Sequence, residues 1–135
     1  MKTILIVAGL IILAGACNGI MDALQFHYSK TGFDEKSQFW NPKISWRNKW
    51  KGGDPKNGPA FFLSTSALVF ITDGWHLFKF LFLGCLRAAF VVLLAQLYPV
   101  RFKQEFKFLF WAGIWGALSW VQALGFHIFY SLILN

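Results

Sequence analysis

Charged side chains are scarce in this chain. Asp, Glu, Lys and Arg make up 14% of its 135 residues, whereas hydrophobic residues make up 56% and include 16 Phe and 7 Trp. A soluble domain averages about 25% charged residues, so a chain with this little charge has to expose a mostly apolar surface. The composition excludes an ordinary soluble domain and indicates lipid as the surrounding solvent. The length fits a single membrane domain, residues 1–135.

Several functional signatures are also missing. The two cysteines, Cys17 and Cys85, both stand in apolar segments, so neither a disulfide framework nor a cysteine metal motif is expected. The chain has no glycine-rich phosphate loop, no Gly-x-Ser-x-Gly and no Cys-x2-Cys. Its net charge of +7 is not gathered on a soluble basic face. We therefore expect no nucleic-acid partner.

The chain has instead three long apolar segments, at about residues 3–25, 73–98 and 106–134. A helix rises about 1.5 Å per residue, so about 20 residues cross a hydrocarbon core about 30 Å thick. The sequence therefore predicts an all-α integral membrane protein with three transmembrane helices. The start of the first segment, up to Cys17, resembles a secretory or lipoprotein leader. Ala14 stands where a lipoprotein leader usually has Leu, and we expect the segment to be retained.

The one extended polar region is the loop 28–60, which carries seven basic and three acidic side chains, a net charge of +4. Within it, Asn41 and Pro42 suit the cap and the first residue of a short helix at 42–51. This helix is amphipathic, basic and rich in Trp, which is typical of a membrane–water interface. We interpret it as an interfacial anchor. A lid or headgroup-recognition element over a site is the alternative.

Residues 60–98 are too long for one straight crossing and too short for two crossings with a turn. We predict a short apolar helix at 61–71, either re-entrant or interfacial, and then a break at Thr72-Asp73-Gly74. A spanning helix follows to Tyr98. A single long kinked helix is the alternative.

Ionisable side chains in apolar surroundings are costly unless they find partners or face a polar cavity. Asp73 and His76 stand three residues apart in one of the most apolar parts of the chain. Three alternating spans bring the end of the first, the start of the second and the end of the third to one membrane face. Asp22, His27 and His127 are therefore expected at the same face as Asp73 and His76.

Neutral imidazoles beside carboxylates suit Zn²⁺ or another divalent transition metal. We predict His27, His76 and His127 as metal ligands. Asp73 and Asp22 are the predicted catalytic residues, each as a ligand or a general base. The layout resembles membrane hydrolases of the alkaline ceramidase and adiponectin-receptor type, which hold zinc with three histidines near one membrane face. This chain has fewer spans and lacks their Ser-x3-His and His-x3-His patterns.

A purely structural interpretation of the same residues is simpler. Asp73 is then a first-turn aspartate, favoured by the helix dipole, in a helix capped by Thr72. His76 and His127 are then interfacial residues that hydrogen-bond to neighbouring helices.

Cations and tryptophans near these residues are candidates for substrate binding. Arg87 stands eleven residues after His76, close to three helical turns, and has to find an anion, carbonyl groups or water. Arg87 or Lys79 is expected to hold an anionic group. Trp46, Arg47 and Trp50 are expected near lipid headgroups.

Three classes of function remain open. The first is a membrane protein that binds or acts on a lipid or amphiphile, as a metal-dependent hydrolase if it is an enzyme. The second is a non-enzymatic subunit, assembly factor or homo-oligomer that packs through small-residue faces such as Gly15 with Gly19. The third is an ion or proton pathway. The basic excess of the loop 28–60 favours the cytoplasmic side of a bacterial inner membrane for the loop and the His/Asp face, whereas the leader-like start at Lys2 favours the opposite orientation.

Overall fold

The computed structural model describes residues 1–134, with side chains for all of these except 126, 127 and 129–134. Helices make up 73% of the chain, and no strand occurs in the described part. The all-helical class predicted from the sequence is confirmed, including three helices that are long and apolar enough to cross a membrane and several short helical pieces.

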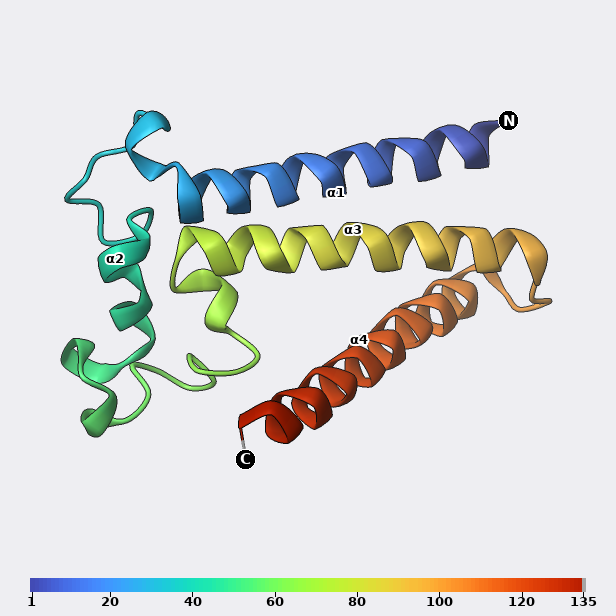
Figure 1. The fold of residues 1–135 in the computed structure, drawn as a ribbon. Coiled ribbons are helices and arrows are strands. Elements are labelled where there is room, and N and C mark those ends of the chain that lie inside the picture. Colours follow the sequence, from blue (N-terminus) through green and yellow to red (C-terminus); the bar gives the residue numbers. More distant parts are fainter. Residues whose placement is uncertain (135) are drawn as a thin grey trace. The chain divides into compact units, whose positions relative to one another are not determined.

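The three long helices are α1 (Lys2–Phe26), α3 (Gly74–Leu97) and α4 (Gln104–Leu134) (Figure 1). Many of their large apolar side chains are exposed, as expected of surfaces that face lipid. These helices indicate a membrane protein.

Six short helical pieces connect α1 to α3: η1 (Tyr28–Lys30), α2 (Pro42–Ser45), η2 (Trp46–Lys49), η3 (Lys51–Gly53), η4 (Pro55–Asn57) and η5 (Val69–Ile71). Local chemistry starts two of them. The Asn41 side chain caps α2 by accepting the Lys43 N–H, and Asp54 caps η4 in the same way at Lys56. Each cap is followed by a proline, which has no N–H to leave unsatisfied.

The segment 42–51 is helical in pieces rather than as one rod. After Ser45 it tightens into η2, and Trp50 then adopts an extended conformation, with φ −114° and ψ 142°. Trp50 therefore does not share a helix face with Trp46, which a continuous helix would require. The apolar segment 61–71 is a series of turns that ends in η5.

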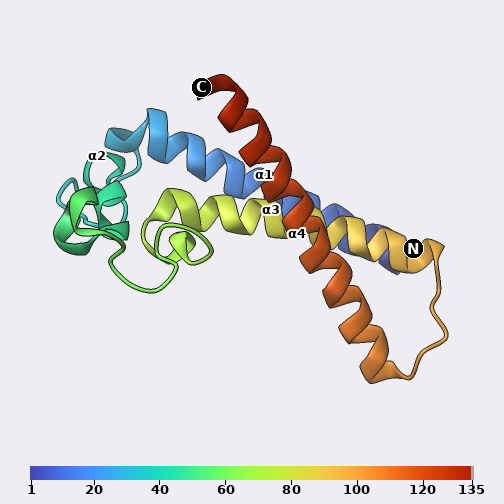
Figure 2. The same cartoon turned by 90° about the horizontal axis from the view of Figure 1, so that it is seen from below.

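The chain forms two compact units, residues 12–84 and residues 1–11 with 85–135. In the unit 12–84, α1 buries one narrow stripe consisting of Ala14, Cys17, Met21 and Leu24. In the other unit, the Thr3 hydroxyl donates to Gln96 Oε1 at 3.0 Å, which joins α1 to α3. Within this second unit, α4 lies obliquely to the part of α3 that begins at Cys85 rather than parallel to it (Figure 2).

The first turn of α3 is held by the loop that precedes α2. The Gly74 N–H donates to the Phe39 carbonyl oxygen at 3.0 Å, which satisfies a donor that a helix start leaves open. The Trp40 ring lies directly over Gly74. A Cβ at Gly74 would lie 2.7 Å from Trp40 Cζ3, closer still to Cε3, and 3.5 Å from Leu24 Cδ1. Only glycine leaves room for the indole here.

Gly74→Ala is expected to lower the free energy of unfolding by about 1–3 kcal/mol, because the added methyl displaces the Trp40 ring. Denaturation in detergent micelles, followed by circular dichroism, measures this loss. Gly113→Ala is the matched control, since nothing lies within 4 Å of a Cβ added there. Equal stability of the two variants would contradict the packing of Trp40 on Gly74.

Candidate functional site

Asp73 is the residue that begins α3. Its Oδ1 accepts the His76 N–H at 2.9 Å, and its carbonyl oxygen accepts the Leu77 N–H at 3.0 Å. These two bonds define a helix N-cap, which contributes about 1 kcal/mol. The structural interpretation of the sequence placed the cap at Thr72 and Asp73 in the first turn, and this assignment of the cap is wrong. The Thr72 hydroxyl instead donates to the Val69 carbonyl oxygen at 2.7 Å.

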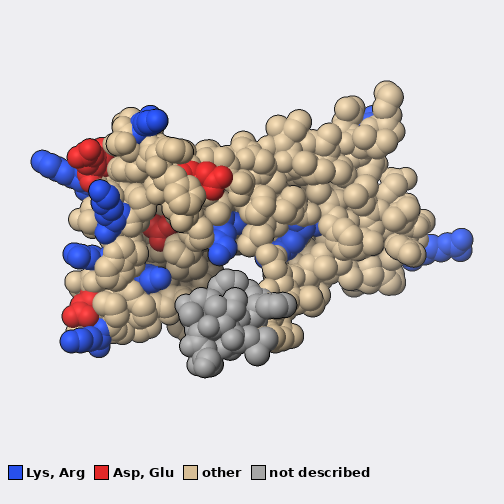
Figure 3. Space-filling view, viewed as in Figure 1, with Lys and Arg blue, Asp and Glu red and all other residues tan. Residues whose placement is uncertain are grey.

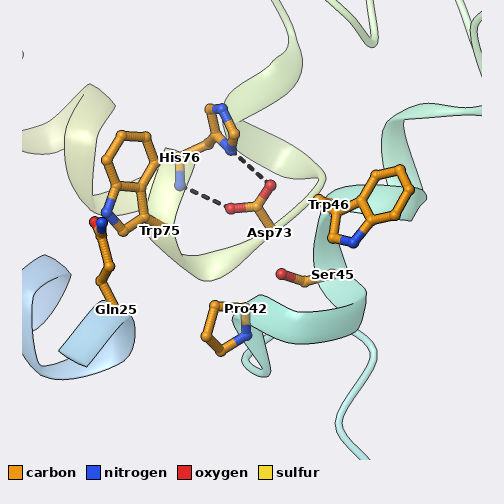
Figure 4. A pocket seen from close by; sticks show the side chains of 7 residues that line it. All are labelled: Gln25, Pro42, Ser45, Trp46, Asp73, Trp75 and His76. Atoms are coloured by element: carbon orange, nitrogen blue, oxygen red, sulfur yellow. Dashed lines mark hydrogen bonds and ion pairs between the residues drawn. The ribbon is translucent and has the colours of Figure 1, made fainter. Parts of the chain in front are cut away.

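The second carboxylate oxygen of Asp73 binds the imidazole of His76. Asp73 Oδ2 lies 2.6 Å from His76 Nδ1, and the two side chains form an Asp–His dyad (Figure 4). The carboxylate is only 2% exposed, whereas the imidazole is 27% exposed. A carboxylate at Nδ1 favours the tautomer that carries its proton there and leaves Nε2 as the acceptor. The geometry is that of an oriented base.

The pKa of Asp73 reflects two opposing effects. Burial alone raises the pKa of this carboxyl, but hydrogen bonds from the His76 ring and backbone, the charge of a protonated imidazole and the nearby Thr72 hydroxyl together lower it below its ordinary value. Asp73 is therefore ionised at neutral pH. Its contribution to stability is present above the pKa of the unfolded chain and is lost as pH falls through the lowered pKa.

The dyad lines a pocket of about 190 Å³ in the unit 12–84. Figure 4 shows the dyad between Trp75, which lies beside Gln25, and Trp46. The full lining is Gln25, Pro42, Ser45, Trp46, Asp73, Trp75 and His76. The end of α1, the helix α2, the start of η2 and the start of α3 thus all contribute to one pocket, whose exposed wall is mostly apolar around the Asp–His dyad.

Asn48 connects the loop to the start of α3. Its Nδ2 donates to the Thr72 carbonyl oxygen at 2.8 Å and to the Gln38 carbonyl oxygen at 2.6 Å. This amide fixes the residue before Asp73, just as Trp40 covers the residue after it. The backbone is therefore held on both sides of Asp73.

No protein-family model, curated protein or solved structure matches this chain. The function is therefore inferred from the chemistry of the residues that line the pocket.

Two further predicted site residues, the metal ligand His27 and the acid Asp22, are not among the residues that line this pocket. Asp22 and His27 are exposed and do not line it, although Gln25, between them in the chain, does. The side chain of His127 lies outside the described residues. Among the side chains that the structure describes, no three His, Cys, Asp or Glu groups gather as a metal site would require.

The predicted substrate-binding cations have other neighbours. Arg87 donates from Nε and Nη2 to Gln122 Oε1, at 3.1 and 2.7 Å, and lies 5.6 Å from the centre of the Trp115 ring. The Lys79 ammonium lies 4.9 Å from the centre of the Trp75 ring, on the first turns of α3. Neither cation lines the dyad pocket.

Of the three predicted headgroup residues, only Trp46 lines the dyad pocket. The guanidinium of Arg47 lies 5.4 Å from the Trp46 ring centre, and the Lys49 ammonium lies 5.9 Å from that of Trp50. Such cation–π pairs are typical of side chains at the membrane–water interface.

Sequence reasoning missed Trp40 and Asn48, which support the dyad, and Pro42, Ser45 and Trp75, which line its pocket. One local signal was available for Trp40. A glycine directly after a helix cap is a position where another group approaches the backbone closely. No sequence pattern indicates which aromatic ring makes that approach.

Asp73→Asn tests the pH dependence of stability. The amide oxygen still caps α3, but the charge bound to His76 is lost, so we expect unfolding to cost about 1–3 kcal/mol less at neutral pH. Wild-type stability should fall as pH drops through the lowered pKa of Asp73, and that part of the fall should be missing in the variant. Denaturation in micelles between neutral and acid pH measures both. If the free energies of unfolding of the wild type and of Asp73→Asn changed with pH in the same way, Asp73 would not be charged in the folded protein.

Proposed function

We propose that this protein binds an amphiphile at one membrane face and hydrolyses an ester bond in it, with His76 as general base. The observation that carries the proposal is the 2.6 Å contact of His76 Nδ1 with the buried carboxylate of Asp73, in an otherwise apolar pocket. A base of this kind needs its imidazole fixed in one tautomer and orientation, and a buried carboxylate supplies both.

The chemistry follows from the free ring nitrogen. His76 Nε2 accepts a proton from water as the water oxygen attacks the ester carbonyl carbon. The same nitrogen then returns the proton to the leaving alcohol as the carbon–oxygen bond breaks. Asp73 stabilises the imidazolium between the two steps. Asp73 is thus a positioning residue, and His76 is the residue that exchanges the proton.

The surroundings favour an amphiphile as substrate. Trp46 and Trp75 offer apolar walls beside the dyad, and Arg47 and Lys49 stack on neighbouring indoles. Rings at headgroup depth with cations beside them favour contact with lipid phosphates. By the basic excess of the loop 28–60, we place this face on the cytoplasmic side of a bacterial inner membrane.

Turnover of glycerophospholipids in mixed micelles, with fatty acid release read by mass spectrometry, tests this function. His76→Gln is expected to lower kcat by about 100-fold or more, and Asp73→Asn by a factor between about 100 and 10,000, as general-base catalysis typically contributes. Lys56→Met, a loop variant outside the pocket, serves as the control. Equal kcat in wild type and His76→Gln would refute the proposal.

A metal-dependent hydrolase is the second candidate, and the same contact favours it. A ligating histidine usually donates its other ring N–H to a carboxylate, as Asp73 is placed to accept from His76. His76 Nε2 would then bind Zn²⁺ or another divalent transition metal, with His27 and His127 as the further ligands.

Metal analysis separates the two candidates. Under the dyad mechanism, the purified protein keeps its kcat after dialysis against EDTA. Under the metal mechanism, the purified protein carries stoichiometric zinc, and His76→Ala loses it. Asp73→Asn lowers the affinity of the protein for zinc about 10–100-fold. Retained zinc in His76→Ala would exclude His76 as a ligand.

A further inference from the structure

A second and larger pocket adjoins the dyad pocket in the unit 12–84. Its volume is about 570 Å³. Gln25 and Pro42 line both pockets, so the two hollows share a wall. The remaining lining residues are Phe26, Tyr28, Ser29, Glu35, Asn41 and Lys43. Unlike the dyad pocket, this one is bordered largely by polar side chains, two of them of opposite charge.

A single buried amide ties the two charged residues together. Asn41 is 9% exposed, accepts the Lys43 N–H at 3.0 Å through its Oδ1 and donates through its Nδ2 to the Glu35 carbonyl oxygen. The backbones of Glu35 and Lys43 are thereby fixed at the rim of one hollow. Their side chains are exposed, and no ion pair between them occurs in the described part of the chain. The pocket thus presents an acid and a cation that do not neutralise one another.

We propose that this second pocket binds the zwitterionic headgroup of a phosphoethanolamine lipid, which extends toward the dyad across Gln25 and Pro42. This rests on the proposed function, whose amphiphile it specifies. The Lys43 ammonium binds the phosphate, because charge-assisted hydrogen bonds to phosphate are among the strongest available to lysine. The Glu35 carboxylate accepts hydrogen bonds from the primary amine.

The charges select against other headgroups. A purely anionic headgroup such as phosphoglycerol has no ammonium group to pair with Glu35. The carboxylates of Glu35 and neighbouring Asp34 then repel the phosphate without compensation. A choline headgroup has no N–H to donate to Glu35. Figure 3 shows that acidic and basic side chains gather together over the part of the chain that carries α2, as a receptor for a zwitterion requires.

Binding of short-chain dihexanoyl phospholipids to the full chain in detergent micelles, measured by calorimetry, tests the headgroup. We expect the phosphoethanolamine lipid to bind about tenfold more tightly than its phosphoglycerol and phosphocholine counterparts, which corresponds to about 1.4 kcal/mol. Lys43→Met is expected to weaken binding of all three. Glu35→Gln is expected to weaken only the phosphoethanolamine lipid and so to remove the preference.

The charge-matched controls are Lys56→Met and Glu105→Gln, which do not line the pocket and are expected to bind as the wild type does. Equal affinity for the three lipids, or equal effects of pocket and control variants, would overturn the proposal. Free phosphoethanolamine that binds as tightly as the lipid would support the headgroup site and identify a soluble ligand as its source.

The outcomes also separate this inference from the proposed function. Selective binding that depends on Glu35, without any turnover that depends on His76, would support the headgroup site and refute the hydrolase. Turnover that depends on His76 but is equal for all three headgroups would support the hydrolase and overturn the headgroup site.

Discussion

A buried carboxylate at the start of a membrane-spanning helix is the constraint on which the rest of this site depends. Asp73 is 2% exposed, and an unpaired charge at such a place would cost several kcal/mol. In the fold, the backbone N–H and the ring of His76 both hydrogen-bond to this carboxylate. Trp40 and Asn48 then secure the residues on either side. Phe39, Trp40 and Asn48 of the loop between α1 and α3 thus all contact the short stretch that contains this side chain.

The two oxygens of Asp73 serve different ends. Oδ1 fixes the helix, and Oδ2 fixes the imidazole three residues on, because a helix N-cap and the third helical residue are always neighbours in space. One carboxylate therefore holds both the helix start and the imidazole of His76. A base that must hold its geometry is better built in this way than on a free loop.

The sequence was informative where the signal is local. Length and hydropathy located the three long helices to within a few residues, Asn41 and Pro42 marked the start of α2, and the polar break at 72–74 marked the start of α3. Each depends on neighbouring residues alone.

Contacts over long separations could not be predicted in the same way. Asn48 reaches Thr72 across 24 positions, and nothing in either residue indicates the other. Alternation of spans predicts which membrane face a residue reaches, but not the direction of its side chain. Asp22 and His27 are exposed near the end of α1, whereas Gln25 between them lines the pocket.

The order of these partners along the chain bears on how the protein is made. Phe39, Trp40 and Asn48 are all synthesised before Gly74. Chains emerge from the ribosome N-terminus first, so the groups that cover the start of α3 exist before that helix does. When Asp73 and Gly74 are synthesised, the Phe39 carbonyl, the Trp40 ring and the Asn48 amide are therefore already part of the chain. The residues that hold the start of α3 are thus available when this helix inserts. Asp73 therefore need not face lipid without partners.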